Sequence, residues 1–385
     1  MQTQPSTARR IGGLAPAAPS NPTGNRRFIA LDSWRGACAL LVAVHNLNFG
    51  TWTPQSTFVA HSWLFVDFFF VLSGFVMTYA YGDRLATARD RAAFVVRRVG
   101  RLWPLHVAVL AMLVGVSLLR PVAARMLLPS PLALPALADD SMRTIAANLL
   151  LVQSFDHPSR LTWNTPSWSI STELWTYFLF AVICSLFAGR RPPLIVMMGA
   201  VTISGCALAL LSADYLATNT DYAFFRCVYG FFVGHLVYRA WESGPLWRWG
   251  GMLEFAAVAL VIGFVFVVDN DALSMTAPVI FGFAVWVFAQ EQGRLSTFLK
   301  RRPFVWLGTW SYSIYMVHWP VRNILVRADP FLERAVQGWM VDALLVGYLI
   351  VVITLAATTY RMVEQPARKL FNRMADSILA GSARD

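Results

Sequence analysis

Residues 31–45 read LDSWRGACALLVAVH, an apolar stretch that opens with Asp32 and Arg35 and carries His45 well inside it. A charged group at bilayer depth is costly, so ionisable residues inside an apolar span usually serve a function. Histidine is also the side chain whose ordinary pKa suits proton transfer near neutral pH. The stretch therefore indicates a membrane protein that carries out chemistry within the bilayer.

The composition extends this interpretation to the whole chain. Its 385 residues are 57% hydrophobic and 14% charged, whereas charged residues make up about 25% of a typical soluble chain. Apolar runs recur throughout, each close to the ~20 residues that a helix needs to cross a bilayer. We therefore expect an all-α, polytopic membrane protein with about ten transmembrane helices. The predicted spans are residues 28–48, 61–81, 94–119, 167–188, 193–213, 221–241, 251–269, 272–290, 303–327 and 338–363.

The net charge of +11 is distributed as a membrane topology requires. If the N-terminus is cytoplasmic, 23 of the 32 basic residues fall on segments that face the cytoplasm. This positive-inside bias predicts that both termini are cytoplasmic. The basic excess then reflects topology and contact with anionic lipid, so no nucleic-acid partner is expected. Thirty arginines against two lysines are typical of a GC-rich bacterial genome. The expected location is the cytoplasmic (inner) membrane, with several passes.

The segments between the spans predict no soluble domain. Residues 1–27 are rich in Pro, Ala, Ser and Gly, which predicts a disordered cytoplasmic tail, and no secretory signal is evident. The long segment 120–166 is expected to be a lid or wall of an external acceptor site, or else a simple tether. Within it, residues 144–155 are too short to cross and should lie along the surface or dip into the membrane. Four cysteines fall within predicted spans and are expected to be packing residues: Cys38, Cys184, Cys206 and Cys227.

His45 is the first candidate site residue. Asn46 and Asn48 follow it, and Arg35 lies on the same predicted helix. A lone histidine in an apolar span is often a packing residue, but the polar residues near His45 favour a catalytic role. A neutral imidazole at this position could take a proton from an acceptor hydroxyl.

Three arginines form the second constellation, at the cytoplasmic start of the third predicted span. Arg97 and Arg101 are i, i+4 neighbours on a helix, and Arg98 and Arg101 are i, i+3 neighbours. Guanidinium groups at a membrane surface suit phosphate binding, although a plain positive-inside anchor is an equally simple interpretation. Pro104 is expected to loosen the helix just beyond them and make room for a ligand.

Further polar residues occur inside other predicted spans. Glu173 lies one helical turn after Ser169, where it could orient an imidazole, bind sugar hydroxyls or simply be solvated. Asp67 requires a partner if its segment spans the bilayer, and Arg35 is one candidate. His318 lies deep in the ninth span, where packing is at least as simple an interpretation as a site role.

Together these segments resemble the acyltransferase 3 family of integral membrane proteins. The resemblance covers residues from about 28 to 370, with the motifs in order along the chain. The matching motifs are LDSWRG at 31–36 with His45, DFFFVLSG at 67–74, Arg97-Arg98 with Arg101 and Pro104, Trp168-Ser169 with Glu173, YSIY at 312–315 with His318, and EQPAR at 364–368.

The resemblance implies ten helices and an acyltransferase that transfers groups other than aminoacyl groups. An acyl group, often acetyl, would pass from cytoplasmic acyl-CoA, a co-substrate with no further cofactor or metal, to a hydroxyl of a glycan or other acceptor. It also implies a membrane domain over residues 28–370 and a cytoplasmic tail over 371–385, without a fused C-terminal hydrolase domain. The implied catalytic residues are His45, the catalytic histidine, and Glu173, which would support the acceptor or the histidine. Arg35, Arg97, Arg98 and Arg101 would serve the donor. The possible supporting residues are Asp32, Asp67, Ser169 and His318.

One departure from the family pattern concerns the first helix. Nine residues separate Arg35 from His45, where the family usually has ten. A ten-residue step leaves the two side chains about 80° apart on a helix, unless the long arginine side chain makes up the difference or a π-bulge restores the phase. This puts direct cooperation between the two residues in doubt. The alternatives to an acyltransferase are a transporter or flippase for a glycan or lipid-linked intermediate, and a non-catalytic scaffold.

Overall fold

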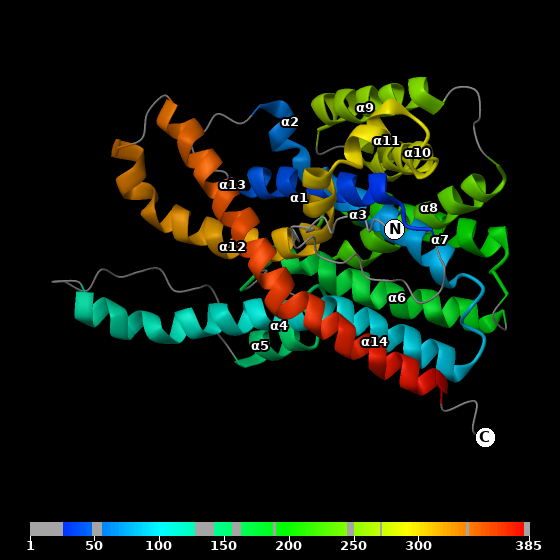
Figure 1. Cartoon of the computed structure of the whole chain (residues 1–385), viewed down its shortest axis with the longest axis horizontal. Coiled ribbons are helices and arrows are strands. Elements are labelled where there is room, and N and C mark those ends of the chain that lie inside the picture. The colour runs from blue at the N-terminus through cyan, green and yellow to red at the C-terminus, as the bar shows by residue number, and fades with distance from the viewer. Residues whose placement is uncertain are drawn as a thin grey trace, which may run out of the picture.

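The computed structural model describes residues 26–47, 56–127, 142–155, 163–187, 190–244, 250–269, 272–335 and 339–380. These residues form a bundle of helices, and no strand occurs among them (Figure 1). The predictions for Asn48, for residues 1–25 of the tail and for residues 128–141 and 156–162 of segment 120–166 lie outside the described residues.

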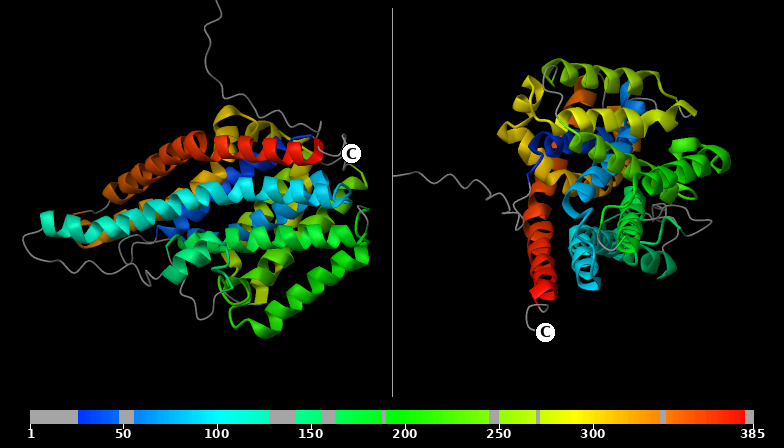
Figure 2. Two further views of the ribbon diagram at one scale, coloured as in Figure 1. Left: turned by 90° about the horizontal axis from the view of Figure 1, so that it is seen from below. Right: turned by 90° about the vertical axis from the view of Figure 1, so that its right-hand side faces the viewer.

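The long helices run roughly side by side, as Figure 2 shows from two further directions. Short helices and turns connect them. The α-helices are α1 Ile29–Asn46, α2 Thr57–Ala60, α3 Phe65–Tyr81, α4 Ala88–Leu127, α5 Met142–Leu149, α6 Trp168–Leu186, α7 Leu194–Leu211, α8 Ala223–Glu242, α9 Gly250–Val267, α10 Ala277–Ala289, α11 Arg294–Leu299, α12 Arg302–Ala335, α13 Trp339–Thr359 and α14 Gln365–Ala380. The 3₁₀ turns are η1 Ser62–Leu64, η2 Thr165–Ser167, η3 Tyr215–Ala217 and η4 Ala272–Thr276, and a π-helical turn, η5 Tyr360–Glu364, joins α13 to α14.

Each of the ten predicted spans coincides with a helix, namely α1, α3, α4, α6, α7, α8, α9, α10, α12 and α13. Six stretches of the described residues are long and apolar enough to cross a membrane. Helices α1, α8 and α12 carry charged residues and fall outside that set, and the apolar stretch of α9, Gly251–Val267, is shorter than those six. The multi-pass membrane class is therefore confirmed, while the count of ten crossings and the cytoplasmic termini stay predictions.

Two local expectations are tested by α4 and α5. Helix α5 begins two residues before the stretch 144–155, which was predicted to be too short to cross, and ends within it. Trp103 Nε1 of α4 donates to the Leu149 carbonyl at 2.8 Å. The prediction that Pro104 loosens the helix is wrong, because α4 is continuous through it. Helix α14 packs along this part of α4 (Figure 2), and Phe371 lies against Gly100. Tertiary packing therefore supports the helix where the proline removes a backbone donor.

Helix α14 also bears on the expected end of the membrane domain. The predicted boundary at residue 370 falls inside α14, which continues to Ala380 along α4. Of the four cysteines, Cys38, Cys184 and Cys227 are buried packing residues as expected. Cys206 is exposed on α7, so the packing prediction is wrong there, because none of the described residues covers this side chain.

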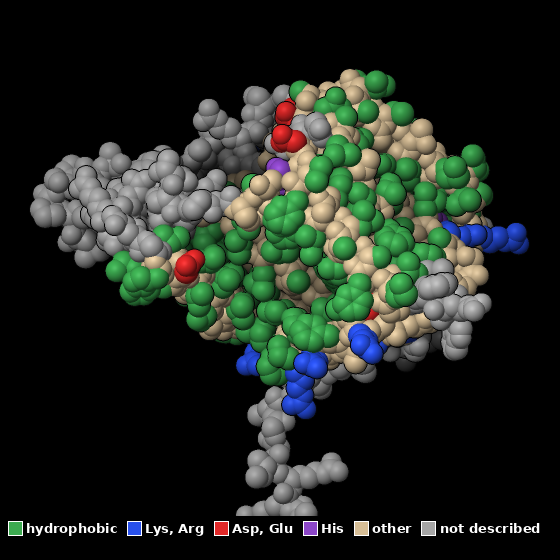
Figure 3. Space-filling model, turned by 90° about the horizontal axis from the view of Figure 1, so that it is seen from above, with side chains coloured by type: hydrophobic (Ala, Val, Ile, Leu, Met, Phe, Trp, Pro, Cys, Tyr) green, Lys and Arg blue, Asp and Glu red, His purple; other side chains and the backbone are tan. Residues whose placement is uncertain are grey.

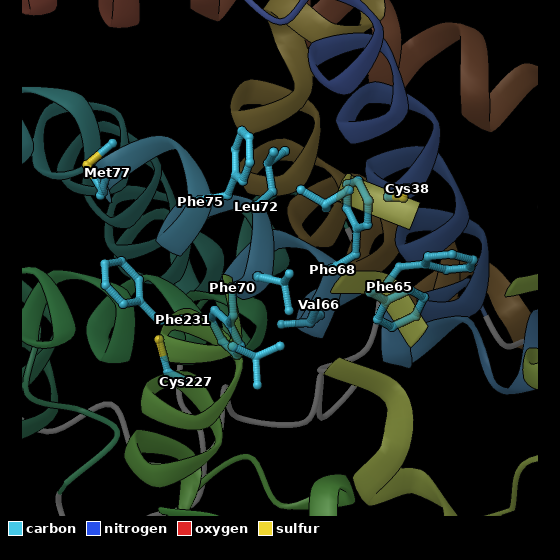
Figure 4. Packing of buried hydrophobic residues seen from close by; sticks show 14 of the residues in the cluster. Cys38, Phe65, Val66, Phe68, Phe70, Leu72, Phe75, Met77, Cys227 and Phe231 are labelled. Carbon is cyan, nitrogen blue, oxygen red and sulfur yellow. The ribbon is translucent and has the colours of Figure 1, made fainter. Parts of the chain in front are cut away.

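Helix α3 occupies the centre of the bundle. Its apolar side chains, together with Cys38 of α1 and with Cys227 and Phe231 of α8, fill the core drawn in Figure 4. Helices α3 and α8 approach closely because a glycine on each helix lies against the backbone of the other, as is usual for packed membrane helices. A Cβ atom at Gly74 would lie 1.8 Å from the Phe231 carbonyl oxygen, and one at Gly234 would lie 1.9 Å from that of Val71.

Outside this core the surface is apolar over a wide area. On the face drawn in Figure 3, hydrophobic side chains cover the broad middle, and the Lys and Arg side chains of the described residues lie at its margins. Large exposed apolar side chains include Leu118, Leu210 and Val267. A surface of this kind is suited to lipid rather than to water.

Candidate active site

His45 lies in the wall of a cavity of ≈ 470 Å³, within the ~300–1,000 Å³ range of small-molecule sites. The lining comes from the end of α1 and from the beginnings of α3, α6 and α8, with Tyr315 from α12. The cavity therefore lies toward one end of the bundle. The lining residues are Val42, His45, Asn46, Ala60, His61, Trp63, Val66, Thr165, Pro166, Trp168, Ala217, Asn219, Arg226 and Tyr315.

A backbone contact sets the tautomer of His45. Its Nδ1 lies 3.1 Å from the Val59 carbonyl oxygen, and a carbonyl can only accept, so Nδ1 carries the proton and donates. In the neutral ring the lone pair is then on Nε2, as a general base requires. The short segment around α2 thus provides the orienting partner that Glu173 was considered for.

Asp67 has a different partner from the one considered for it. Arg226 Nε donates to Asp67 Oδ1 at 3.0 Å and Nη2 to Oδ2 at 2.7 Å. Both side chains are almost completely buried, with 2% and 0% of their surfaces exposed. The guanidinium lies over the rings of Trp63 and Trp168, 5.0 and 5.2 Å from their centroids. The pairing of Asp67 with Arg35 is therefore wrong.

Arg35 is engaged with α12 instead. Its Nε donates to Ser311 Oγ at 2.8 Å and its Nη2 to the Gly308 carbonyl at 3.1 Å, while Asp32 lies 3.3 Å away. Helix α1 is regular α-helix throughout, so no π-bulge restores the phase between Arg35 and His45. The separation inferred from their spacing is confirmed. Asp32 is also ion-paired with Arg27 at 2.8 Å.

The three arginines of α4 lie on the part of the helix that packs against α14 and η5. Arg97 Nη2 donates to Asp376 Oδ1 at 2.6 Å, and Arg101 is ion-paired with the buried Glu364, so each already faces a carboxylate. Glu364 also accepts a hydrogen bond from Ser313 at 2.8 Å.

Arg98 differs from its two neighbours. Its guanidinium carbon lies over the rings of Tyr81, Phe94 and Tyr177, at 5.5, 5.9 and 5.8 Å from their centroids. Its Nη1 donates to Met77 Sδ at 3.4 Å, and its buried Nε has no hydrogen-bond partner among the described residues. Of the three arginines, Arg98 therefore has the most capacity to bind an added anion.

Glu173 lies away from the cavity wall, on the side of α6 toward Arg98. Its Oε1 accepts hydrogen bonds from Ser73 Oγ at 2.6 Å and from the Tyr177 hydroxyl, whose ring lies beside Arg98. Glu173 therefore does not orient His45 in this structure. It belongs to a polar group in the interior between the arginines and the cavity.

Ser169 and His318 support the cavity from behind. Ser169 Oγ lies 2.8 Å from the hydroxyl of the cavity residue Tyr315, and both groups donate to the Pro166 carbonyl. His318 Nδ1 donates to the Tyr315 carbonyl at 2.7 Å, and its buried Nε2 has no hydrogen-bond partner among the described residues. Neither residue lines the cavity itself. No group of His, Cys, Asp and Glu suited to a metal ion occurs in the part of the chain that the structure describes.

Two cavity residues were not anticipated from the sequence. Arg226 is a charge inside a predicted span and would have met the same criterion that singled out Asp67. His61 stands at the first position of a predicted span, where interfacial histidines are unremarkable, so no sequence signal identified it.

The fold and the site define a class: a multi-pass helical membrane protein with a histidine in the wall of a cavity and partly buried arginines elsewhere in the bundle. A family model described as an acyltransferase domain matches residues 28–361. The chain therefore belongs to the acyltransferase 3 family. It is accordingly an enzyme that transfers acyl groups other than aminoacyl groups, which decides against the transporter and scaffold alternatives.

Three relatives illustrate this similarity. "Protein 2 in picA locus" of Rhizobium radiobacter is 31% identical over 208 residues, covering 49% of this chain and 96% of that protein. The acyltransferase MdmB of Streptomyces mycarofaciens is 26% identical over 336 residues, covering 80% and 81%. The putative peptidoglycan O-acetyltransferase YrhL of Bacillus subtilis strain 168 is 27% identical over 403 residues, and this chain spans 90% of its own length but 56% of that relative's. No solved structure matches the chain.

Proposed function

We propose that the protein moves an acetyl group from acyl-CoA to a hydroxyl of a glycan in the His45 cavity. The orientation of His45 carries the proposal, since the Nδ1 contact with the Val59 carbonyl leaves Nε2 as the base. Support for an acetyl group and a glycan acceptor comes from the name of the YrhL relative, a putative peptidoglycan O-acetyltransferase. The remaining steps follow from where the charged groups lie.

The donor enters from the arginine end of the bundle, which we assign to the cytoplasm of an inner-membrane protein with cytoplasmic termini. Arg98 receives a donor phosphate, while Arg97 and Arg101 keep their carboxylate partners Asp376 and Glu364. The thioester then reaches past the polar group around Glu173 to the cavity. No cofactor besides acyl-CoA takes part.

In the transfer step, His45 Nε2 takes the proton from the acceptor hydroxyl as its oxygen attacks the thioester carbonyl carbon. The tetrahedral intermediate collapses by breaking the C–S bond, and the thiolate of CoA leaves. The products are the acyl ester and CoA, and the proton on His45 is lost to the thiolate or to water. The reaction needs no reactant besides the acyl-CoA and the acceptor.

The proposal is tested with purified wild-type protein, [¹⁴C]acetyl-CoA and surface glycan from cells that lack the protein. We expect label to move to the glycan in detergent, where no membrane gradient exists. Mass spectrometry of surface glycans from cells with and without the protein identifies the acylated species. Absence of label transfer together with identical glycans in the two cell types would overturn the proposed function.

A separate prediction concerns the arginines. Arg98→Gln is expected to raise the KM for acetyl-CoA more than Arg97→Gln does, because Arg98 alone of the three has no carboxylate partner among the described residues. Loss of one charge-assisted phosphate contact is worth about 1.5–3 kcal/mol, or a ~10–150-fold rise in KM. Steady-state kinetics with a fixed acceptor measure this. An equal effect of both substitutions would contradict the distinction.

A further inference from the structure

His61 and Arg226 line the same cavity as His45, although neither belongs to the transfer step described above. His61 stands between α2 and η1, and Arg226 stands in the first turn of α8. Both side chains are ionisable and lie in the same small cavity as the proposed base. Because burying polar groups in a membrane protein is costly, we expect them to have a function there.

His61 is held in the same way as His45. Its Nδ1 lies 3.0 Å from the Val265 carbonyl of α9, so Nδ1 donates and the neutral ring keeps its lone pair on Nε2. No hydrogen bond between described residues engages that Nε2. His61 therefore offers the cavity a second hydrogen-bond acceptor.

Arg226 offers donors of hydrogen bonds. A guanidinium has five N–H groups; Asp67 takes one from Nε and one from Nη2, and the Thr218 carbonyl takes one from Nη1 at 3.0 Å. Two N–H groups remain on a side chain that lines the cavity. The rings of Trp63 and Trp168, which line the same cavity, fix the plane of the guanidinium.

The charge of this arrangement indicates what it binds. Asp67 neutralises Arg226 through a bidentate pair, so the pair presents donors without a net positive charge. An anionic ligand would gain little net attraction from a neutral pair and would lose its hydration. A hydroxyl suits the site better, because it can donate to His61 Nε2 and accept from an Arg226 N–H at the same time.

We infer that His61 and Arg226 bind a second hydroxyl of the acceptor, next to the one that His45 activates. This subsite selects a polyhydroxylated acceptor, such as a sugar, over a simple alcohol. It also determines which hydroxyl is acylated, because holding one hydroxyl fixes the orientation of its neighbours relative to His45. The inference rests on the proposed function. His61 and Arg226 act here as positioning residues.

The test maps where acyl groups are attached to the surface glycan of cells that express each variant in place of the wild type. Two-dimensional NMR of the isolated glycan locates each ester. We expect one acylated position with the wild type, and acyl groups spread over several positions at a lower total with His61→Ala. His61→Gln is expected to restore the single position, because its amide oxygen can accept a hydrogen bond near the former Nε2.

The matched control is His106→Gln. His106 is also a buried histidine bonded to a backbone carbonyl, with Nε2 2.9 Å from the Asn148 oxygen, and it does not line the cavity. It should leave both the extent and the position of acylation unchanged. Size-exclusion chromatography in detergent confirms that equal amounts of folded protein are compared.

The other possible results of this experiment each contradict either the inference or the proposed function. Acylation by His61→Ala at a single unchanged position, whatever its extent, would overturn the inference, because a merely structural role lowers the amount without moving the position. If His61→Ala yields no ester to map, the Asp67→Asn, Arg226→Gln double variant carries the same expectation. Complete loss of acylation in both variants, with the protein folded, would also overturn a role of His61 and Arg226 in selecting the hydroxyl. Absence of acylated glycan with the wild type would instead refute the proposed function.

Discussion

Replacing His45 by alanine is expected to lower the turnover number for acetyl transfer by about 10²–10⁴-fold, the usual contribution of a general base. The reason is the position of Nε2, which carries the lone pair in a cavity because Nδ1 is committed to the Val59 carbonyl. His45→Gln should lose as much, since an amide can form hydrogen bonds but cannot take up the proton. The measurement is the initial rate of label transfer from [¹⁴C]acetyl-CoA at saturating donor.

The KM for acetyl-CoA separates a catalytic loss from a folding defect. It should change little in both His45 variants, because Arg98 lies on α4, which contributes no residue to the lining of the His45 cavity. His106→Gln again serves as the matched control. Transfer by His45→Ala at within about threefold of the wild-type rate would rule out a general-base role of the size expected.

The second large effect concerns the pair formed by Asp67 and Arg226. Removing one partner from a buried ion pair leaves an uncompensated charge and costs about 3–5 kcal/mol. Both side chains are buried here, with 0% and 2% exposed, so Asp67→Asn and Arg226→Gln should each destabilise the protein strongly. Thermal unfolding in detergent, followed by the loss of the monodisperse peak in size-exclusion chromatography, measures this.

The double variant Asp67→Asn, Arg226→Gln should regain much of the lost stability, because no unpaired charge remains. An exposed pair provides the control: Arg191 is ion-paired with Glu242, whose side chain is 40% exposed. Breaking that pair with Arg191→Gln should cost only about 0–1 kcal/mol. A double variant as unstable as the worse single variant, or single variants as stable as Arg191→Gln, would contradict the assignment of a coupled buried pair.

Much of the candidate site could be found from the sequence, because charged and polar residues inside apolar spans are energetically costly and therefore rare. His45, Asp67, Glu173 and the arginines of α4 were recognised by charge or polarity inside predicted spans. The contacts that these residues make were harder to predict from the sequence. Glu173 was considered as a partner of His45, yet its carboxylate is bonded to Ser73 and Tyr177.

The pairing of side chains was the part that could not be predicted. Asp67 and Arg226 are 159 residues apart, and Arg101 and Glu364 are 263 residues apart. Helical periodicity indicates which face of a helix a residue occupies, but not which other helix that face meets. The same limit hid the difference among the three arginines of α4, which depends on whether α14 or η5 supplies a carboxylate.

The sequence by itself determined the all-helical membrane class and the order and approximate bounds of its helices, because a run of apolar residues must form a helix wherever its backbone leaves water. Motifs read along the chain also indicated the family, which the match of the family model to residues 28–361 confirms. Only the tertiary structure decided that α3 meets α8 through Gly74 and Gly234, that Arg226 pairs with Asp67, and that His61 joins His45 in one cavity. These contacts form only when helices that are distant in the sequence pack side by side. They are therefore a property of the assembled bundle and not of any single segment.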